Sequence, residues 1–108
     1  MVNLAIWAQL EAKPGKEREL EEFLKSAQPL AERERGTISW YAVKLRPGQF
    51  GIFDTFQDEA GRKAHLTGEI AKALFAKAAE LLAKEPEIHQ IEILAAKTHS
   101  AGAAKAGA

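Results

Sequence analysis

The sequence predicts an α+β fold, in which one four-stranded antiparallel sheet is covered on one face by two helical regions. Residues 2–12 alternate between apolar and polar side chains, which is the period of two typical of a strand. Residues 37–56 contain two more such segments, joined at Pro47-Gly48. Before and after this hairpin, apolar residues recur at spacings of three and four, which indicates helices. With a last strand at 88–97, the order of elements matches the split βαβ arrangement (βαββαβ) of ferredoxin-like domains.

The first strand and the first helical region each have an apolar side. Pro29, inside the helical region at 16–35, predicts a kink or a restart, because proline donates no backbone hydrogen bond and crowds the preceding turn. Gly36 is expected to end the region. The apolar helical stripe consists of Leu20, Phe23, Leu24, Ala27 and Ala31. The strand places Val2, Leu4, Ile6, Ala8 and Leu10 on one face and Asn3, Ala5, Trp7, Gln9 and Glu11 on the other.

The hairpin and the second helical region carry clear boundary signals. The Pro47-Gly48 pair combines a fixed negative φ with a residue free to adopt a positive φ, which predicts a tight turn. Asp58 is expected to cap the first turn of the second helical region. Thr67-Gly68 interrupts that region, so Thr67 is expected to cap a second helix, which Pro86 closes. The stripe of this helix consists of Ile70, Ala71, Leu74, Phe75, Ala78, Leu81 and Leu82.

One face of the predicted sheet has no helix to cover it. Neighbours such as Trp40 and Tyr41, or Ile52 and Phe53, point to opposite faces, so both faces carry bulky apolar groups. Monomers rarely expose an apolar patch of that size. We therefore expect a homodimer that pairs the uncovered faces about a two-fold axis, the commonest symmetry of oligomers.

Length and composition are typical of one globular domain. A chain of 108 residues fits a single core, which we expect over 1–97, with 98–108 as a disordered tail that has little to bury. Lys plus Arg and Asp plus Glu both number 15, so no net charge favours nucleic acid or an acidic membrane surface. The absence of cysteine excludes disulfides and thiolate sites. The first residues do not read as a signal peptide, and no apolar run approaches the roughly 20 residues of a membrane span, so we expect a cytoplasmic protein with neither nucleic acid nor membrane as partner.

Four stretches of the chain carry a family resemblance. They are Lys13-Pro14-Gly15-Lys16, the run from Arg35 to Tyr41, the run from Phe53 to Ala60, and Ala64-His65-Leu66. Together they resemble the antibiotic biosynthesis monooxygenase domain, over roughly 2–97. The resemblance implies a dimeric α/β-barrel fold and kinship with small quinol monooxygenases and polyketide-oxidising enzymes, which use molecular oxygen without metal or flavin. Relatives on this scaffold also degrade haem, isomerise small sugar-derived signals or have no known activity, and fold alone does not decide among these.

The haem-degrading branch can be compared residue by residue. Its members use an asparagine in the first strand and a tryptophan and a histidine in the helical region. Aligned by eye on 53–56, this chain has Ala8 or Gln9, His65 and Phe75 at about those places. The haem-binding set is missing, so haem degradation is not expected.

His65 and Asp54 are the candidates for catalytic chemistry. His65 lies on the first short helix after the hairpin, where the resemblance implies a pocket between helices and sheet. An imidazole with a pKa of about 6.5 can remove a phenolic or quinol proton and leave an electron-rich anion that reacts with oxygen. Asp54 can orient His65 or accept a substrate hydroxyl. The alternatives are that His65 only bonds across a helix junction and that Asp54 binds backbone amides at the end of its strand.

A set of mostly aromatic side chains is the candidate wall of a ligand pocket, because such pockets are largely apolar with few polar anchors. Tyr41 is preferred to Trp40, which must point the other way, since the Tyr41 hydroxyl can donate a hydrogen bond. The alternative is that most of these residues belong to the core or the dimer interface. The candidates for substrate binding are Tyr41, Trp7, Phe53, Phe56, Phe75 and Asn3, with Gln9 on the same face as Asn3.

Metal and cofactor sites have no support in the sequence. His65, His89 and His99 are scattered and lack the spacing of metal ligands, and we expect His89 on a strand surface and His99 in the tail. No glycine-rich phosphate-binding motif is present. We therefore expect neither a metal nor an organic cofactor.

Three functions remain open at this point. The leading hypothesis is a cofactor-independent monooxygenase that oxidises a quinol or polyphenolic compound, with His65 as base and Asp54 supporting it. The alternative is a non-catalytic dimer that binds a small aromatic or stress-related ligand. The third is an isomerase or lyase on the same scaffold.

Overall fold

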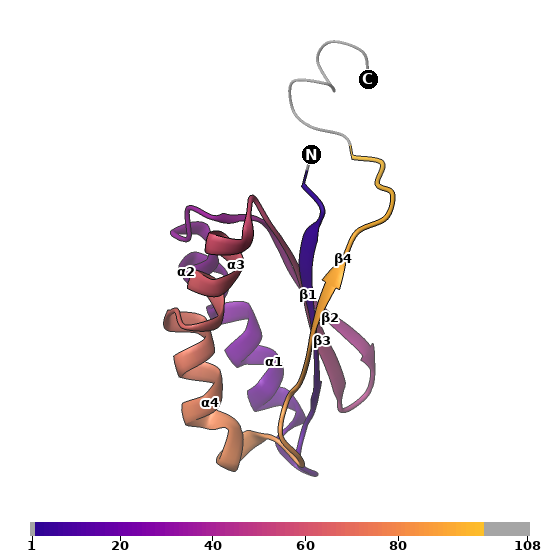
Figure 1. Cartoon of the computed structure of the whole chain (residues 1–108). Coiled ribbons are helices and arrows are strands. Elements are labelled where there is room, and N and C mark those ends of the chain that lie inside the picture. The colour runs from indigo at the N-terminus through magenta and orange to yellow at the C-terminus, as the bar shows by residue number, and fades with distance from the viewer. Residues whose placement is uncertain (1, 99–108) are drawn as a thin grey trace.

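The computed structural model describes residues 2–98 and confirms the predicted α+β fold. One four-stranded antiparallel sheet has the strand order β2-β3-β1-β4, and all four helices lie on one side of it (Figure 1). The elements are β1 (Leu4–Glu11), α1 (Glu17–Ser26), α2 (Gln28–Glu32), β2 (Thr37–Arg46), β3 (Gln49–Phe56), α3 (Glu59–Leu66), α4 (Glu69–Leu81) and β4 (Glu87–Glu92).

The boundary signals of the first helical region and of the hairpin act as predicted. Pro29 lies in the first turn of α2, so the helical region breaks and restarts there. In the hairpin, Gly48 has φ +81°, as the Pro47-Gly48 turn requires.

The second helical region is also broken in two, but one cap differs from the prediction. Asp58 caps α3, its Oδ1 accepting from the backbone N–H of Gly61 at 2.8 Å. The prediction that Thr67 caps α4 is wrong, because Gly68 is the N-cap and no side chain bonds there. The Thr67 hydroxyl instead closes the end of α3 by donating to the carbonyl of Lys63 at 3.2 Å.

The first and last strands of the chain are shorter than predicted. β1 covers 4–11 rather than 2–12, with an isolated bridge between Ala12 and Leu82 beyond it. β4 ends at Glu92 rather than at 97, although the N–H of Ile93 still donates to the carbonyl of Asn3 at 2.7 Å. Apart from Thr98, the tail predicted for 98–108 lies outside the described residues.

Strand register decides which side chains meet the helices. Ile6, Asp54 and Trp40 are register partners on β1, β3 and β2, and they lie on the helix-covered face. Trp7, Phe53 and Tyr41, one residue along, are partners on the opposite face. The main core under the helices comprises Ala8, Leu10, Ala12, Leu20, Leu24, Phe50, Ile52, Leu74, Leu81 and Leu82.

Two glycines let the segment before β2 pack directly on α3. A Cβ added to Gly61 would lie 2.8 Å from the carbonyl oxygen and 3.0 Å from the Cα of Gly36. Such distances are shorter than van der Waals contact, so neither position has room for a side chain. The close approach fixes residues 33–37 against the helix that carries His65.

We predict that Gly61→Ala destabilises the protein although alanine favours helix. Helix propensity alone would stabilise this variant by about 1 kcal/mol. The clash with Gly36 should outweigh that gain and lower the free energy of unfolding by about 1–3 kcal/mol. Urea unfolding followed by circular dichroism measures the change, with Lys63→Ala, an exposed site on α3, as the control. A Gly61→Ala protein as stable as the unmodified chain would show that the contact is not tight.

Candidate functional site

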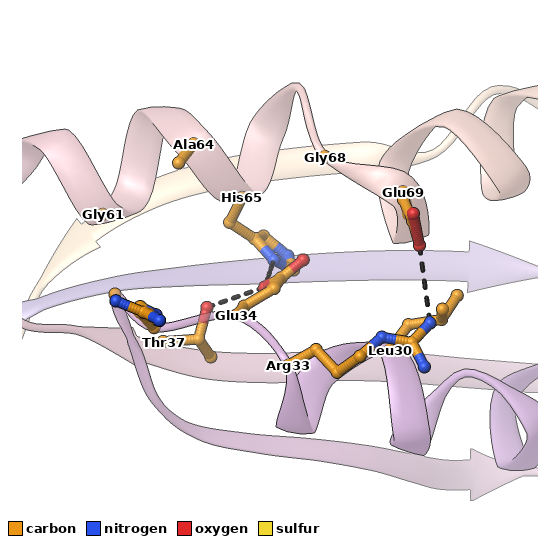
Figure 2. Close-up of a pocket in the computed structure, with 11 residues that line it drawn as sticks. Leu30, Arg33, Glu34, Thr37, Gly61, Ala64, His65, Gly68 and Glu69 are labelled. Atoms are coloured by element: carbon orange, nitrogen blue, oxygen red, sulfur yellow. Dashed lines mark hydrogen bonds and ion pairs between the residues drawn. The ribbon is translucent and has the colours of Figure 1, made fainter.

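Three side chains from separate elements meet beneath α3. His65 Nε2 lies 2.8 Å from Oδ2 of Asp54 on β3, and His65 Nδ1 lies 2.7 Å from Oε1 of Glu34, which precedes β2. Figure 2 shows the Glu34 side chain between His65 and Thr37, whose hydroxyl donates to the same Oε1 at 2.7 Å. The imidazole is therefore held between two carboxylates, one at each ring nitrogen.

The inner half of this cluster is closed to solvent. Asp54 is 0% exposed and His65 is 8% exposed. The contact between Nε2 and Oδ2 has the length of a hydrogen bond, but the ring N–H is not well directed at this oxygen, so within residues 2–98 Asp54 lacks a well-formed side-chain hydrogen bond. The pair is better described as a buried ion pair than as a directed hydrogen bond.

Burial and charge shift the two inner groups in the same direction. Burial raises the pKa of Asp54, and the neighbouring His65 offsets only part of that rise. Burial alone would lower the pKa of His65, but contacts with Asp54 and then Glu34 outweigh burial and raise this pKa above its usual value. His65 therefore holds its proton more firmly in this site than a histidine side chain free in water would.

Glu34 is the functional candidate that sequence reasoning missed. It lies in the alternating run Glu32-Arg33-Glu34-Arg35, which has the character of a solvated surface segment. Its side chain is nevertheless only 19% exposed, because the contact of Gly36 with Gly61 brings this segment against α3. No local sequence pattern marks Glu34 as a site residue. The one sequence feature that relates to its burial is Gly36, two positions later.

A pocket of about 230 Å³ opens beside Glu34 and His65. It lies between the end of α2 and the junction of α3 with α4 (Figure 2). Arg33 and Glu69 lie 3.6 Å apart and link α2 to α4, and Arg35 also lines the pocket. The volume is below the roughly 300–1,000 Å³ of drug-sized ligand sites, which favours a compound of one or two rings.

The structure separates the other predicted site residues from this cluster. Phe56 is close to it, with its ring centroid 5.3 Å from that of His65. Trp7, Tyr41 and Phe53 lie on the opposite face of the sheet, and Asn3 precedes β1 on the same side as Trp7. Phe75 is 51% exposed on α4. These aromatic residues therefore do not form one pocket with His65 and Asp54 in a single chain.

Residues 2–98 contain no group of three or more His, Asp or Glu side chains placed to hold a metal ion. Over the same range, no helix has the length and apolar character needed to cross a membrane.

We predict that His65 makes stability fall as the pH rises above about 6.5, the unfolded pKa, because the pKa of His65 is raised in the folded protein. A raised folded-state pKa stabilises the protein fully below the unfolded pKa of about 6.5, and this contribution is lost as the pH rises through the folded value. Each pKa unit of difference corresponds to about 1.4 kcal/mol. Urea unfolding between about pH 6 and pH 9 should show this decline, and His65→Gln should flatten it while the exposed-site control His89→Gln does not. An unchanged pH dependence in His65→Gln would contradict the assignment.

Comparison with known proteins identifies the family. A solved structure of a protein of unknown function from Nitrosomonas europaea matches over 91% of this chain and 95% of its own, with 56% identity and a TM-score of 0.88. A conserved protein from Methanosarcina mazei matches over 86% and 94%, with 25% identity and a TM-score of 0.75. A further Nitrosomonas europaea protein, named as a candidate antibiotic biosynthesis monooxygenase, matches over 85% and 90% with 14% identity and a TM-score of 0.76, which shows the fold alone.

No curated protein matches this chain. Residues 4–77, more than half of the chain, match the family described as antibiotic biosynthesis monooxygenase. The chain belongs to the antibiotic biosynthesis monooxygenase family.

Proposed function

We propose that this protein is a monooxygenase that oxidises a small quinol or polyphenol and needs neither metal nor flavin. The observation that carries the proposal is the arrangement of His65, with Asp54 at Nε2 and with Nδ1 at the inner wall of a pocket sized for one or two rings. Membership of a family named for monooxygenases supports the reaction class.

The geometry suits removal of a hydroxyl proton from a bound phenol. When Glu34 leaves Nδ1 and the proton on that nitrogen passes to solvent, a substrate hydroxyl in its place can give its own proton to Nδ1, while Asp54 stabilises the resulting imidazolium from the other side. Contacts with both carboxylates raise the pKa of His65, and Asp54 keeps its share of that effect when Glu34 moves away. His65 is then the base and Asp54 the residue that positions it.

Loss of the proton prepares the ring for oxygen. The phenolate donates electrons to O₂, one oxygen atom bonds to a ring carbon, and the other leaves as water with two hydrogens from the substrate. A quinol thereby becomes a hydroxyquinone, so the four electrons that O₂ accepts all come from the substrate. No external reductant is required.

A specific observation also favours a second candidate, a non-catalytic dimer that binds a small aromatic ligand. Both ring nitrogens of His65 already face carboxylates, and Thr37 completes the hydrogen bonding of Glu34. A cluster whose charges compensate one another in this way can also serve only to join β3, α3 and the start of β2. The two candidates differ in whether His65 turns over a substrate.

Oxygen uptake with menadiol tests the proposed reaction. We expect the protein to accelerate uptake above the rate of menadiol alone, and His65→Ala to lose about 100-fold or more of that activity, the usual contribution of a general base. Asp54→Asn should lower the rate less, because it leaves the base in place. His89→Ala, an exposed histidine on β4, is the matched control.

Isotope labelling defines the chemistry further. With labelled O₂, one labelled atom should enter the ring and one should enter water. A rate that His65→Ala leaves unchanged would remove the mechanism. Binding without turnover would favour the second candidate, and turnover without oxygen would favour an isomerase or lyase.

We also propose that two copies of the chain pair through the helix-free face of the sheet. This face carries Trp7, Tyr41, Val43, Phe53 and Ile91. Tyr41 is 57% exposed and Val43 is 38% exposed, although both are apolar enough to favour burial. The six-membered ring of Trp7 occupies the space that a Cβ on Gly51 would take, so this glycine makes room for the indole on the helix-free face.

Substitution on opposite sides of the molecule tests this pairing. We expect a dimer by size exclusion with light scattering at micromolar concentration, and a monomer for Tyr41→Glu, because the new charge would be buried between the sheets. Phe75 on α4 is an aromatic residue of similar exposure, and the Phe75→Glu variant should remain dimeric. A stable monomer of the unmodified chain would contradict the proposal.

A further inference from the structure

Glu34 occupies the position that a ligand oxygen would need. Its Oε1 accepts hydrogen bonds from His65 Nδ1 and from the Thr37 hydroxyl, both at 2.7 Å. Its Oε2 lies against the start of α4, where a Cβ on Gly68 would be only 3.2 Å away. A carboxylate of the protein itself therefore fills the inner end of the pocket.

The surroundings of this carboxylate favour an anionic oxygen in general. His65, with its raised pKa, offers a charged N–H, and Thr37 offers a hydroxyl. Arg35 lines the same pocket, as does Arg33, whose guanidinium faces Glu69 at 3.6 Å. The amides at the start of α4, which no side chain caps, add a favourable dipole. A phenolate oxygen has the charge and the acceptor capacity to replace the Glu34 oxygen here.

The Glu34 side chain can leave without displacement of its backbone. The Glu34 N–H donates to the carbonyl of Ala31 at 3.1 Å, and the Glu34 carbonyl accepts from the N–H of Thr37 at 3.3 Å. These bonds anchor the segment on both sides of the side chain. Side-chain rotation toward solvent is then sufficient to free Nδ1.

We infer that Glu34 is an exchangeable internal occupant of a phenolate site, and that the ligand binds as its phenolate in place of the Glu34 carboxylate. When Glu34 turns away, the Nδ1 proton leaves to solvent; His65 then takes the proton of the phenol, whose O–H electron pair stays on oxygen. One proton is released overall and no electrons are transferred. The inference deepens the proposed function, since it rests on placing the substrate beside His65 and specifies the ionised form and the group that it displaces.

Binding of 4-nitrophenol tests this without any turnover, because its neutral and ionised forms have different absorbance spectra. At a fixed pH just below the pKa of free 4-nitrophenol, titration with the unmodified protein should increase the phenolate band. The methyl ether 4-nitroanisole, which cannot ionise, should not compete. His65→Gln should abolish the increase in the phenolate band.

Removal of the internal competitor should strengthen binding. A ligand that must displace Glu34 binds with an apparent Kd equal to its intrinsic Kd divided by the fraction of protein in which Glu34 has left the site. Glu34→Gln should therefore bind 4-nitrophenol at least about threefold more tightly than the unmodified protein. Glu69→Gln removes the same charge from the same pocket but does not contact His65, so its Kd should change by less than about twofold.

Each result either supports or contradicts the exchange of Glu34 for a phenolate. Tighter binding in Glu34→Gln than in Glu69→Gln supports it, and equal or weaker binding overturns it. Binding of neutral 4-nitrophenol to the unmodified protein also overturns it, which keeps the test valid if Glu34→Gln does not fold. Phenolate binding together with a failed oxygen-uptake assay would support this inference and contradict the proposed monooxygenase activity. Oxygen uptake without phenolate binding would support the monooxygenase activity and contradict this inference.

Discussion

Asp54 is the buried charge around which the helix-covered face of the sheet is arranged. A carboxylate without solvent is costly by several kcal/mol unless a partner compensates it. His65 is that partner, at 2.8 Å, and its own charge is supported from the other side by Glu34. Both carboxylates depend on His65, because removal of the imidazole would leave each without its partner, whereas removal of one carboxylate leaves His65 with the other. This dependence ties β3, α3 and the segment before β2 into one unit.

Backbone packing brings the third group, the Glu34 carboxylate, to His65. Glu34 is 31 positions from His65 in the sequence, and its side chain reaches the ring only because Gly36 and Gly61 allow their backbones to touch. Both glycines are used for their lack of a side chain rather than for an unusual φ. Polar residues therefore determine the chemistry of the pocket, but Gly36 and Gly61, which have no side chain, allow Glu34 to come within reach of His65.

Much of the fold follows from local signals. Pro29, Pro47-Gly48 and Asp58 act over one or two turns of chain, where proline, glycine and capping rules hold with little tertiary influence. Thr67 failed as a cap because its hydroxyl was already bonded within α3, a competition between two local patterns. The ends of β1 and β4 were misplaced because apolar alternation continues past the point where a neighbouring strand is available for pairing.

The site was less predictable than the fold. Asp54 and His65 were singled out by residue type and family resemblance, and their contact confirms only that they are close. The aromatic residues were grouped by chemistry, but strand register distributes them between two faces of the sheet. Glu34 required knowledge of a contact between distant segments, which neither composition nor periodicity contains.

Phe53 and Asp54 make the length of β3 important to both faces of the sheet. Phe53 belongs to one surface of the sheet and Asp54 to the other, so a single inserted or deleted residue would exchange their environments and place a phenylalanine beside His65. Substitutions can alter either surface separately, whereas a change of length alters both at once. A change of length within β3 would therefore disturb the His65 site and the helix-free face together.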